Sequence, residues 1–311
     1  MKTYHNGKFT GAYDTSTNIN LLKILKWKLF DHIPRIWQKQ KIVKPLELHL
    51  EADKLLQEKD FICWLSHASF LIQLGGKRFL VDPVFGDIPF YKRQITTPYS
   101  VAELGDIDYL LVSHVHYDHF DIASIKAVAT PAIKAILPLN MSKQIDQISD
   151  IETVEIDWYE CYNDGDIQIT LVPAKHWGRR GIFDKNRVLW GGYILTYKGK
   201  SIYFAGDTAA GGHFEEIGQR FNIEYALLPI GAYRPEFIMK YNHLNPKEAF
   251  DAFKQLKAKM MIPMHYGTFN LTDEPLDEPL MWVEELAKEN PNMIKTLNVG
   301  EVLTISKTIS T

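Results

Sequence analysis

The stretch Ser113-His114-Val115-His116-Tyr117-Asp118-His119 holds three imidazoles and one carboxylate within six residues. It follows an apolar run that is typical of a buried strand, so the cluster lies where a strand ends and a loop begins. Side chains two residues apart in an extended chain point to the same side, and His114 and His116 can therefore face one metal ion together. Asp118 and His119 follow as the chain turns and can face a second ion.

Imidazole and carboxylate groups are ligands of zinc and of similar divalent ions. The alternative interpretation is a polar loop with chance histidines. The whole chain of 311 residues contains only 11 histidines, however, and three of them fall within this stretch. The cluster therefore predicts a metal centre built on the junction of a strand and a loop.

The composition is that of a globular protein without an obvious nucleic-acid partner. Hydrophobic residues make up 46% and charged residues 23% of a chain long enough to bury a large core. The net charge of −3 is unevenly distributed, because residues 1–60 contain 11 Lys/Arg and 7 Asp/Glu, which leaves the remainder acidic. An acidic main region disfavours binding to nucleic acid.

The cysteines and the N-terminus predict a cytoplasmic protein. Cys63 and Cys161 are too few for a disulfide framework and lack Cys-x-x-Cys spacing, so we interpret both as structural thiols in a reducing compartment. Residues 1–7 lack the apolar core and cleavage site of a signal peptide. No stretch approaches the roughly 18 uncharged apolar residues that a membrane-spanning helix needs.

From residue 60 onward, predicted strands alternate with predicted helices. Gly75-Gly76 and Lys198-Gly199-Lys200 are typical of tight turns between antiparallel strands. The pattern favours one α/β domain at 60–311 with two sheets and outer helices, preceded by an extension at 1–59. The expected strands are 61–65, 69–74, 77–81, 133–137, 166–173, 192–197, 201–205, 225–230, 260–264 and 301–306, and the expected helices are 121–129, 141–148, 245–258 and 278–290.

The extension contains a candidate amphipathic helix. Residues 1–17 look irregular, and a helix is predicted at 18–33 because apolar residues recur at spacings of three and four. The segment 18–41 is also basic and contains tryptophan. The apolar stripe can pack on the core, which the pattern alone favours, or the helix can lie on an anionic membrane surface. The stripe consists of Leu22, Leu25, Leu29 and Ile33.

Three later residues come directly after apolar, strand-like runs: His176, Asp207 and His265. Gly206 allows the backbone to turn before Asp207. Loops beyond the ends of buried strands are where sites are usually built. A single histidine after a strand is more often a solvated residue, but three such points in this order, together with the cluster at 113–119, predict a site for two metal ions.

With these residues, the chain resembles the metallo-β-lactamase superfamily, whose His-x-His-x-Asp-His signature is followed by a distant His, Asp and His. Within it, the chain is similar to the branch of N-acyl-phosphatidylethanolamine-hydrolysing phospholipases D. The resemblance covers about residues 60–275 and implies an αββα four-layer sandwich, here with an N-terminal helical extension. The stretches that carry it include Trp64-Leu65-Ser66-His67-Ala68-Ser69, Val81-Asp82-Pro83-Val84-Phe85, Lys175-His176-Trp177, Phe204-Ala205-Gly206-Asp207-Thr208, Pro229-Ile230-Gly231-Ala232-Tyr233, Tyr241-Asn242-His243-Leu244-Asn245-Pro246-Lys247-Glu248-Ala249 and His265-Tyr266-Gly267-Thr268-Phe269.

The resemblance implies two zinc ions, although iron or manganese would also suit these ligands. In the family, a histidine at the position of His243 lies beside the metals, and we expect His243 and Asp118 to have catalytic roles. The implied ligands are His114, His116 and His176 for the first ion, Asp118, His119 and His265 for the second, and Asp207 as the bridge between them.

Other positions near the expected site have less defined roles. Asp82 either orients a ligand histidine or caps a turn, and we expect His67 to support the site without being a ligand. The family commonly has Gly at the position of Ser66 and Gly-Tyr-Cys-like residues at 209–211, where this chain has Ala-Ala-Gly. These departures concern the mouth of the site and the headgroup preference, whereas the implied metal ligands do not depart from the family pattern.

The implied reaction is hydrolysis of N-acyl-phosphatidylethanolamine to phosphatidic acid and an N-acylethanolamine, by a homodimer. A phospholipid substrate strengthens the interpretation of 18–41 as a peripheral membrane contact. Two other classes remain open: a hydrolase of the same fold that acts on another ester, lactone or phosphodiester, and a di-iron redox protein. The aromatic flanks at 88–91 and 237–239 favour an apolar ligand, and the lack of a flavin domain or further cysteine cluster counts against redox chemistry.

Overall fold

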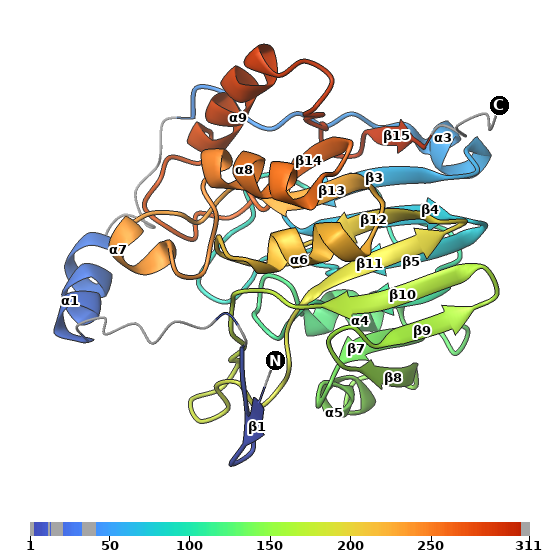
Figure 1. Cartoon of the computed structure of the whole chain (residues 1–311), viewed down its shortest axis with the longest axis horizontal. Coiled ribbons are helices and arrows are strands. Elements are labelled where there is room, and N and C mark those ends of the chain that lie inside the picture. The colour runs from blue at the N-terminus through green and yellow to red at the C-terminus, as the bar shows by residue number, and fades with distance from the viewer. Residues whose placement is uncertain (1–2, 12, 14–20, 33–41, 306–311) are drawn as a thin grey trace.

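The computed structural model describes residues 3–11, 13, 21–32 and 42–305, and its body is formed by two β-sheets packed face to face (Figure 1). One sheet has seven strands in the order β15-β3-β4-β5-β6-β7-β8, and the other has six in the order β14-β13-β12-β11-β10-β9. The first consists of β3 (Phe61–Ser66), β4 (Ser69–Leu74), β5 (Lys77–Val81), β6 (Tyr109–Leu111), β7 (Lys134–Pro138), β8 (Glu152–Ile156) and β15 (Val302–Thr304). The second consists of β9 (Cys161–Asp164), β10 (Ile167–Val172), β11 (Gly192–Tyr197), β12 (Lys200–Phe204), β13 (Ile223–Pro229) and β14 (Met260–Met264).

The chain direction within each sheet brings several strand ends to one edge. Strands β3, β5 and β6 run the same way, because β4 is antiparallel to both β3 and β5 while β5 and β6 are parallel. In the other sheet, β10, β12, β13 and β14 share one direction for the same kind of reason. The loops that follow these strands therefore meet at a common edge, which is where open α/β sheets bind their ligands.

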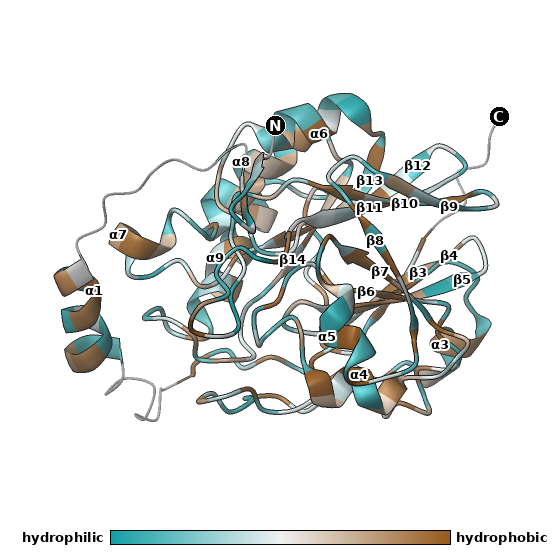
Figure 2. Cartoon of the chain, turned by 90° about the horizontal axis from the view of Figure 1, so that it is seen from below, coloured by the Kyte–Doolittle hydropathy of each residue, from teal (hydrophilic) through white to brown (hydrophobic). Residues whose placement is uncertain are grey.

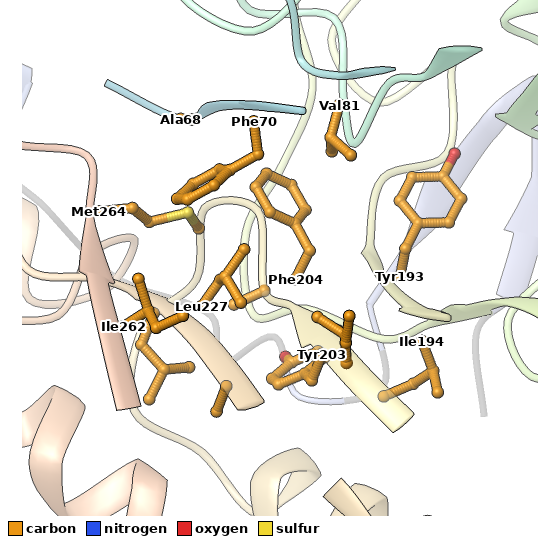
Figure 3. Packing of buried hydrophobic residues seen from close by; sticks show 14 of the residues in the cluster. Ala68, Phe70, Val81, Tyr193, Ile194, Tyr203, Phe204, Leu227, Ile262 and Met264 are labelled. Carbon is orange, nitrogen blue, oxygen red and sulfur yellow. The ribbon is translucent and has the colours of Figure 1, made fainter. Parts of the chain in front are cut away.

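The apolar core lies between the two sheets. Strands β3 and β4 are almost continuously buried, as expected for strands covered on both faces. Phe70 of β4 meets Phe204 of β12 edge to face with ring centroids 6.2 Å apart, and Met264 reaches toward Phe70 (Figure 3). Because such interiors are close-packed, this contact between the sheets fixes the spacing of the loops at their common edge.

Helices cover the outer faces and complete a four-layer sandwich (Figure 2). α6 (His213–Arg220) and α8 (Pro246–Leu256) pack against each other outside the six-stranded sheet, and α3 (Ala52–Gln57) and α4 (Ile122–Val128) lie outside the seven-stranded one. The αββα prediction is therefore confirmed. The remaining helices of the body are α5 (Ser142–Asp146), α7 (Glu236–Met239) and α9 (Glu278–Glu289).

Within 60–305, each predicted strand and helix is present, with ends that differ by no more than two residues. Five elements of the body, including α3 before residue 60, were not predicted, namely β8, β9, α3, α6 and α7. Strands β8 and β9 are sheet edges with few buried side chains, so they lack the apolar run that marks an inner strand. α3 has only six residues, too few for an apolar stripe to repeat.

The start of the chain is more regular than predicted. Residues 3–10, expected to be irregular, form a hairpin of β1 (Thr3–His5) and β2 (Lys8–Thr10). Phe9 is buried in the main core, and its amide donates to the carbonyl oxygen of Asn186 at 2.7 Å. The hairpin is therefore attached to a loop of the main body.

The predicted N-terminal helix is present, but its apolar stripe does not pack on the core. Residues 21–32 form α1 (Leu21–Lys26) and the π-helical η1 (Trp27–His32). Leu22 is 75% exposed and Leu29 is 57% exposed, so the expectation of core packing is wrong. The rest of the predicted segment, 18–20 and 33–41, lies outside the described residues.

Polar contacts attach this segment to the body instead. Trp27 Nε1–H donates to Asp273 Oδ2 at 2.6 Å, and His32 Nε2 lies 3.0 Å from the hydroxyl of Tyr91. The Lys23 ammonium lies 4.2 Å from the centre of the Phe237 ring, which places α1 beside α7 (Figure 1). Among the described residues, no helix combines the length and apolarity that crossing a membrane requires.

Candidate metal centre

The candidate ligands lie on loops that leave the common edge of the two sheets. Several of these loops turn in the left-handed region of the backbone, with φ of 42° at Asp82, 51° at His67 and 61° at His265. Residues other than glycine rarely adopt this conformation, and such strain clusters at functional sites. Gly206 has φ of 60°, and a Cβ there would lie 2.9 Å from Cβ of Ser113, so the turn before the predicted bridging carboxylate requires glycine.

A first cluster contains His114, His116, His176 and Asp207, whose ligand atoms all lie within 4.8 Å of one another. His116 Nδ1 is 2.9 Å from His114 Nε2 and 3.2 Å from His176 Nε2. The structure therefore brings together the three histidines that the sequence assigned to the first ion, with the predicted bridge beside them.

A second cluster contains Asp118, His119, His265 and, in addition, His67. Asp118 Oδ2 is 3.3 Å from His265 Nε2 and 3.7 Å from His119 Nε2. His67 Nε2 lies 3.1 Å from the same oxygen. The three residues predicted for the second ion are thus together, and a histidine expected only to support the site contacts them directly.

The Asp207 carboxylate lies between the two clusters. Its Oδ1 is 3.1 Å from His265 Nε2, and its Oδ2 is 3.3 Å from His119 Nε2, both in the second cluster. The same Oδ2 is 3.8 Å from the Nε2 atoms of His114 and His176 in the first. This is the position that a bridging ligand would need.

Outer hydrogen bonds hold the rings in place. Asp82 is fully buried and accepts hydrogen bonds from the Ser113 amide at 2.7 Å and the Ser113 hydroxyl at 2.6 Å. Its Oδ2 also lies 2.7 Å from His119 Nδ1, while Ser113 Oγ lies 2.9 Å from His114 Nδ1. Of the two roles that the sequence allowed for Asp82, the structure therefore shows contact with a candidate ligand. Such outer partners fix the tautomer and orientation of metal-binding imidazoles.

Burial keeps the first group of histidines neutral. It lowers the pKa of His114 and His176 well below the usual value and the pKa of His116 to about 4. Neighbouring imidazoles lower the pKa of His114 and His176 further, since a second positive charge nearby is unfavourable. Each of these rings therefore has an unprotonated nitrogen near pH 7, which is the form that binds a metal ion.

The carboxylates are charged for a different reason. Burial favours the neutral acid, but His119 opposes it and holds the pKa of both Asp118 and Asp207 well below its ordinary value. Burial likewise disfavours a charged His265, yet Asp207 and Asp118 raise its pKa to about 9 and raise the pKa of His119 well above the usual value. Two imidazolium groups thus balance two carboxylates, and bound cations would replace them in that role with release of the protons.

The donor set fits a pair of divalent ions such as zinc. Among the described residues, the buried atoms His119 Nε2, His265 Nε2 and Asp207 Oδ1 make no hydrogen bond. Buried polar atoms normally have partners, so the absence of any at three converging atoms indicates a ligand site. Ligand atoms around a tetrahedral zinc ion lie about 3.3 Å apart, close to the separations within both clusters.

His243 lies beside the clusters, as the resemblance implied. Its Nδ1 is 3.8 Å from Asp207 Oδ2, and the carbonyl of the preceding Asn242 lies 3.1 Å from His176 Nδ1. The loop is fixed because α8 begins directly after it with a capping box between Asn245 and Glu248.

The open side of the site is formed by His116, Asp118 and His243, which are all partly exposed. The Asp118 and His243 side chains are each 14% exposed, whereas those of His119, His265 and Asp207 are at most 2% exposed. A substrate therefore meets these three side chains before the deeper ligands.

One histidine that sequence reasoning left out, His213, joins two loops of the site. Its Nε2 lies 3.0 Å from Thr208 Oγ1, and that oxygen accepts the Lys175 amide at 3.0 Å. Thr208 and Lys175 adjoin Asp207 and His176, so this bond fixes the spacing of two candidate ligands. No sequence spacing indicates it, because the contact depends on how α6 packs.

Sequence comparison identifies the same family across most of the chain. The profile of the beta-lactamase superfamily domain matches residues 77–266. The chain is 32% identical, over an alignment of 330 residues, to N-acyl-phosphatidylethanolamine-hydrolyzing phospholipase D 1 of Caenorhabditis elegans, covering 97% of this chain and 92% of that protein. It is 34% identical over 239 residues to the mitochondrial N-acyl-phosphatidylethanolamine-hydrolyzing phospholipase D of Saccharomyces cerevisiae, covering 72% of this chain but 51% of that protein.

Structure comparison finds the same architecture in distant hydrolases. Igni18, a metallo hydrolase of the archaeon Ignicoccus hospitalis, superposes with a TM-score of 0.62 at 21% identity and covers 80% of this chain and 99% of that one. At this identity the likeness shows the shared fold alone.

Proposed function

The chain belongs to the metallo-β-lactamase superfamily, in the branch that resembles N-acyl-phosphatidylethanolamine-hydrolysing phospholipase D, and we propose that it is a zinc-dependent phosphodiesterase of phospholipase D type. A metal-dependent hydrolase is the class that the family establishes. The observation that carries the finer proposal is a buried carboxylate, Asp207, between two clusters of histidines at the mouth of an αββα sandwich. The proposal of a homodimer rests on the family resemblance.

The proposed ligand sets follow the two clusters. Asp207 faces both and would be shared between them. When bound, the metal pair supplies a water nucleophile at neutral pH and neutralises charge on the phosphoryl oxygens. The proposed ligands are His114, His116 and His176 for one ion and Asp118, His119 and His265 for the other.

Two residues on the open side of the site have roles beyond binding metal. The Asp118 carboxylate is kept ionised by its histidine neighbours and can accept a proton from the attacking water. His243 is placed to donate a hydrogen bond to a phosphoryl oxygen or to the leaving group, which stabilises charge that develops during the reaction.

Apolar residues around the mouth of the site support a lipid substrate. Phe90 is 86% exposed, and its neighbour Tyr91 contacts His32 of the N-terminal segment. Phe237 of α7 lies under Lys23 of α1. The two aromatic flanks noted in the sequence therefore lie beside the helical segment 21–32, one at η1 and the other at α1, and apolar and polar residues alternate along this segment (Figure 2). A phosphodiester with long acyl chains would match a polar metal site within an apolar rim.

The substrate proposal is tested by following which bond breaks. Purified protein should release N-acylethanolamine and phosphatidic acid from N-acyl-phosphatidylethanolamine in detergent micelles. Plain phosphatidylethanolamine, a lactone and a cyclic nucleotide serve as comparison substrates. Release of free fatty acid would assign a different bond and contradict the phospholipase D proposal, and faster turnover of the lactone would favour the alternative hydrolase class.

We also propose that the helical segment 21–32, formed by α1 and η1, makes a peripheral membrane contact. Besides Leu22 and Leu29, Phe30 is 71% exposed, and Lys23, Lys26 and Lys28 lie on the same 12-residue segment. Apolar residues flanked by lysine suit the surface of an anionic bilayer, where each buried methylene contributes about 0.8 kcal/mol.

The triple variant Leu22→Ser, Leu29→Ser, Phe30→Ser should therefore bind anionic vesicles at least about tenfold more weakly in a sedimentation assay. Its turnover of substrate dispersed in detergent should be unchanged, because none of these residues is in the metal centre. Leu56→Ser is a matched control, since Leu56 is 76% exposed on α3 at the opposite end of the molecule (Figure 1). Equal vesicle binding by the triple variant and the wild type would exclude the helical segment 21–32 as the contact.

A further inference from the structure

His67 contacts the second cluster through one ring nitrogen. The residue is 1% exposed, and its Nε2 lies 3.1 Å from Asp118 Oδ2. We propose that His67 is a positioning residue, which donates its Nε2–H to Asp118 and so holds that carboxylate toward the second metal ion. The inference rests on the paired-metal centre of the proposed function and adds a residue that the family ligand pattern does not include.

The backbone of His67 is fixed to the loop that carries another candidate ligand. Its amide donates to Thr268 Oγ1 at 2.9 Å, and its carbonyl oxygen accepts the His265 amide at 2.9 Å. The same carbonyl accepts Trp64 Nε1–H at 2.9 Å. These bonds hold two consecutive residues in the left-handed region, with φ of 94° at Ser66 and 51° at His67. Such strain persists only where the surroundings over-determine the conformation.

The ring of His67 is confined on both sides. The centroid of the His265 ring lies 4.1 Å from that of His67. The Phe269 ring packs edge to face against His67, with centroids 5.1 Å apart and an angle of 79° between the ring planes. The other ring nitrogen, Nδ1, is buried and makes no hydrogen bond among the described residues. Among the described residues, Asp118 is therefore the one hydrogen-bond partner of the His67 ring.

Asp118 needs a donor that is not itself a ligand. The other imidazoles near its carboxylate are His119 and His265, at 3.7 Å and 3.3 Å. When these nitrogens bind a metal ion, they have no proton to donate, and His67 remains as the donor. Asp118 is also the most exposed of the proposed ligands of the second ion, with its side chain 14% exposed, so it gains most from an added restraint.

A competing role is that His67 is a fourth ligand, since its Nε2 lies within 4.8 Å of the ligand atoms of the second cluster. Two substitutions separate the roles. Gln and Met have the same length and no branch, but only Gln can donate a hydrogen bond to Asp118. His67→Gln therefore preserves the proposed interaction, whereas His67→Met removes it with little change in volume.

The experiment measures zinc affinity by titration against a chelator of known strength, together with metal stoichiometry. His67→Met should lower the affinity for the second zinc ion by about 10–100-fold and leave the affinity for the first ion unchanged. The affinities of His67→Gln should remain close to those of the wild type. His67→Asn, whose amide is too short to reach Asp118, should behave like His67→Met and provides the test if that variant does not fold. Thermal unfolding of the metal-free forms identifies the folded variants.

Two results would overturn the inference. Wild-type affinity for both ions in folded His67→Met and His67→Asn would show that Asp118 needs no donor. Equal loss of the second ion in folded His67→Gln and His67→Met would assign His67 as a ligand. If the wild-type protein itself binds only one ion, the paired-metal function fails first, and the variants are not needed to see it.

Discussion

Replacing Asp207 with Asn is expected to lower kcat/KM by about 10³-fold or more and to leave fewer than two metal ions per chain. Asp207 is 3% exposed, and its two oxygens lie 3.1 Å from His265 Nε2 and 3.3 Å from His119 Nε2. The amide has the same size but carries no charge and offers one oxygen, so it cannot face both clusters. Metal analysis of the purified variant and initial rates on micellar substrate measure the two effects.

The same substitution at a surface position serves as a control for any general effect of replacing Asp with Asn. Asp251 lies on the exposed surface of α8, where it pairs with Lys247 and Lys254 at 2.7 Å each. Exposed pairs of this kind contribute little to stability, so Asp251→Asn should retain both metal ions and full activity. Two ions and normal turnover in Asp207→Asn would show that the centre needs no bridging carboxylate.

The second-largest effect is expected from Asp82, although it does not face the substrate. Asp82→Asn should lower the metal affinity or activity by about 10–100-fold. The carboxylate accepts both the amide and hydroxyl of Ser113 and faces His119 Nδ1–H. An amide group must turn its NH₂ toward one of these donors, which either frees the His119 ring or leaves a buried donor unpaired at a cost of about 1–3 kcal/mol.

Two measurements together identify this effect. The zinc affinity, measured by titration, shows whether the His119 ring is still held in place. The stability of the metal-free protein, measured by thermal unfolding, shows the cost of the unpaired buried donor. Ser113→Ala is the milder comparison. It removes the hydroxyl but keeps the hydrogen bond from the backbone amide of residue 113 to Asp82, and it keeps the contact between Asp82 and the His119 ring. Unchanged zinc affinity in Asp82→Asn would show that packing alone orients His119.

The sequence predicted the candidate metal ligands that the structure brings together, because each follows an apolar run and such runs are visible without a structure. The contacts of His67 and His213 were not predictable in this way. His67 reaches Asp118 across 51 residues, and His213 reaches Thr208 only because α6 packs beside that loop. Contacts between loops depend on how the two sheets are placed, which no local pattern records.

The N-terminal helix shows a different limit. Its apolar spacing predicted a helix at 18–33, and the described residues 21–32 are helical. A periodic pattern shows that one face is apolar but not what covers that face. Leu22, Leu25 and Leu29 would look the same on a helix packed on the core, yet they are 75%, 47% and 57% exposed. The actual attachment, through Trp27 and His32, consists of polar contacts that periodicity does not measure.

Each metal cluster draws its residues from both sheets, and this has a consequence during synthesis. The seven-stranded sheet supplies His114 and His116 to one cluster and Asp118 and His119 to the other, all on the loop after β6. The partners from the six-stranded sheet come later in the chain, ending with His265. A growing chain therefore presents half of the first site for about 90 residues, until Asp207, and half of the second for about 150 residues, until His265. With the proposed ligands, stable metal loading would report that the two halves of the sandwich have docked, and it would act as a checkpoint for finished folding.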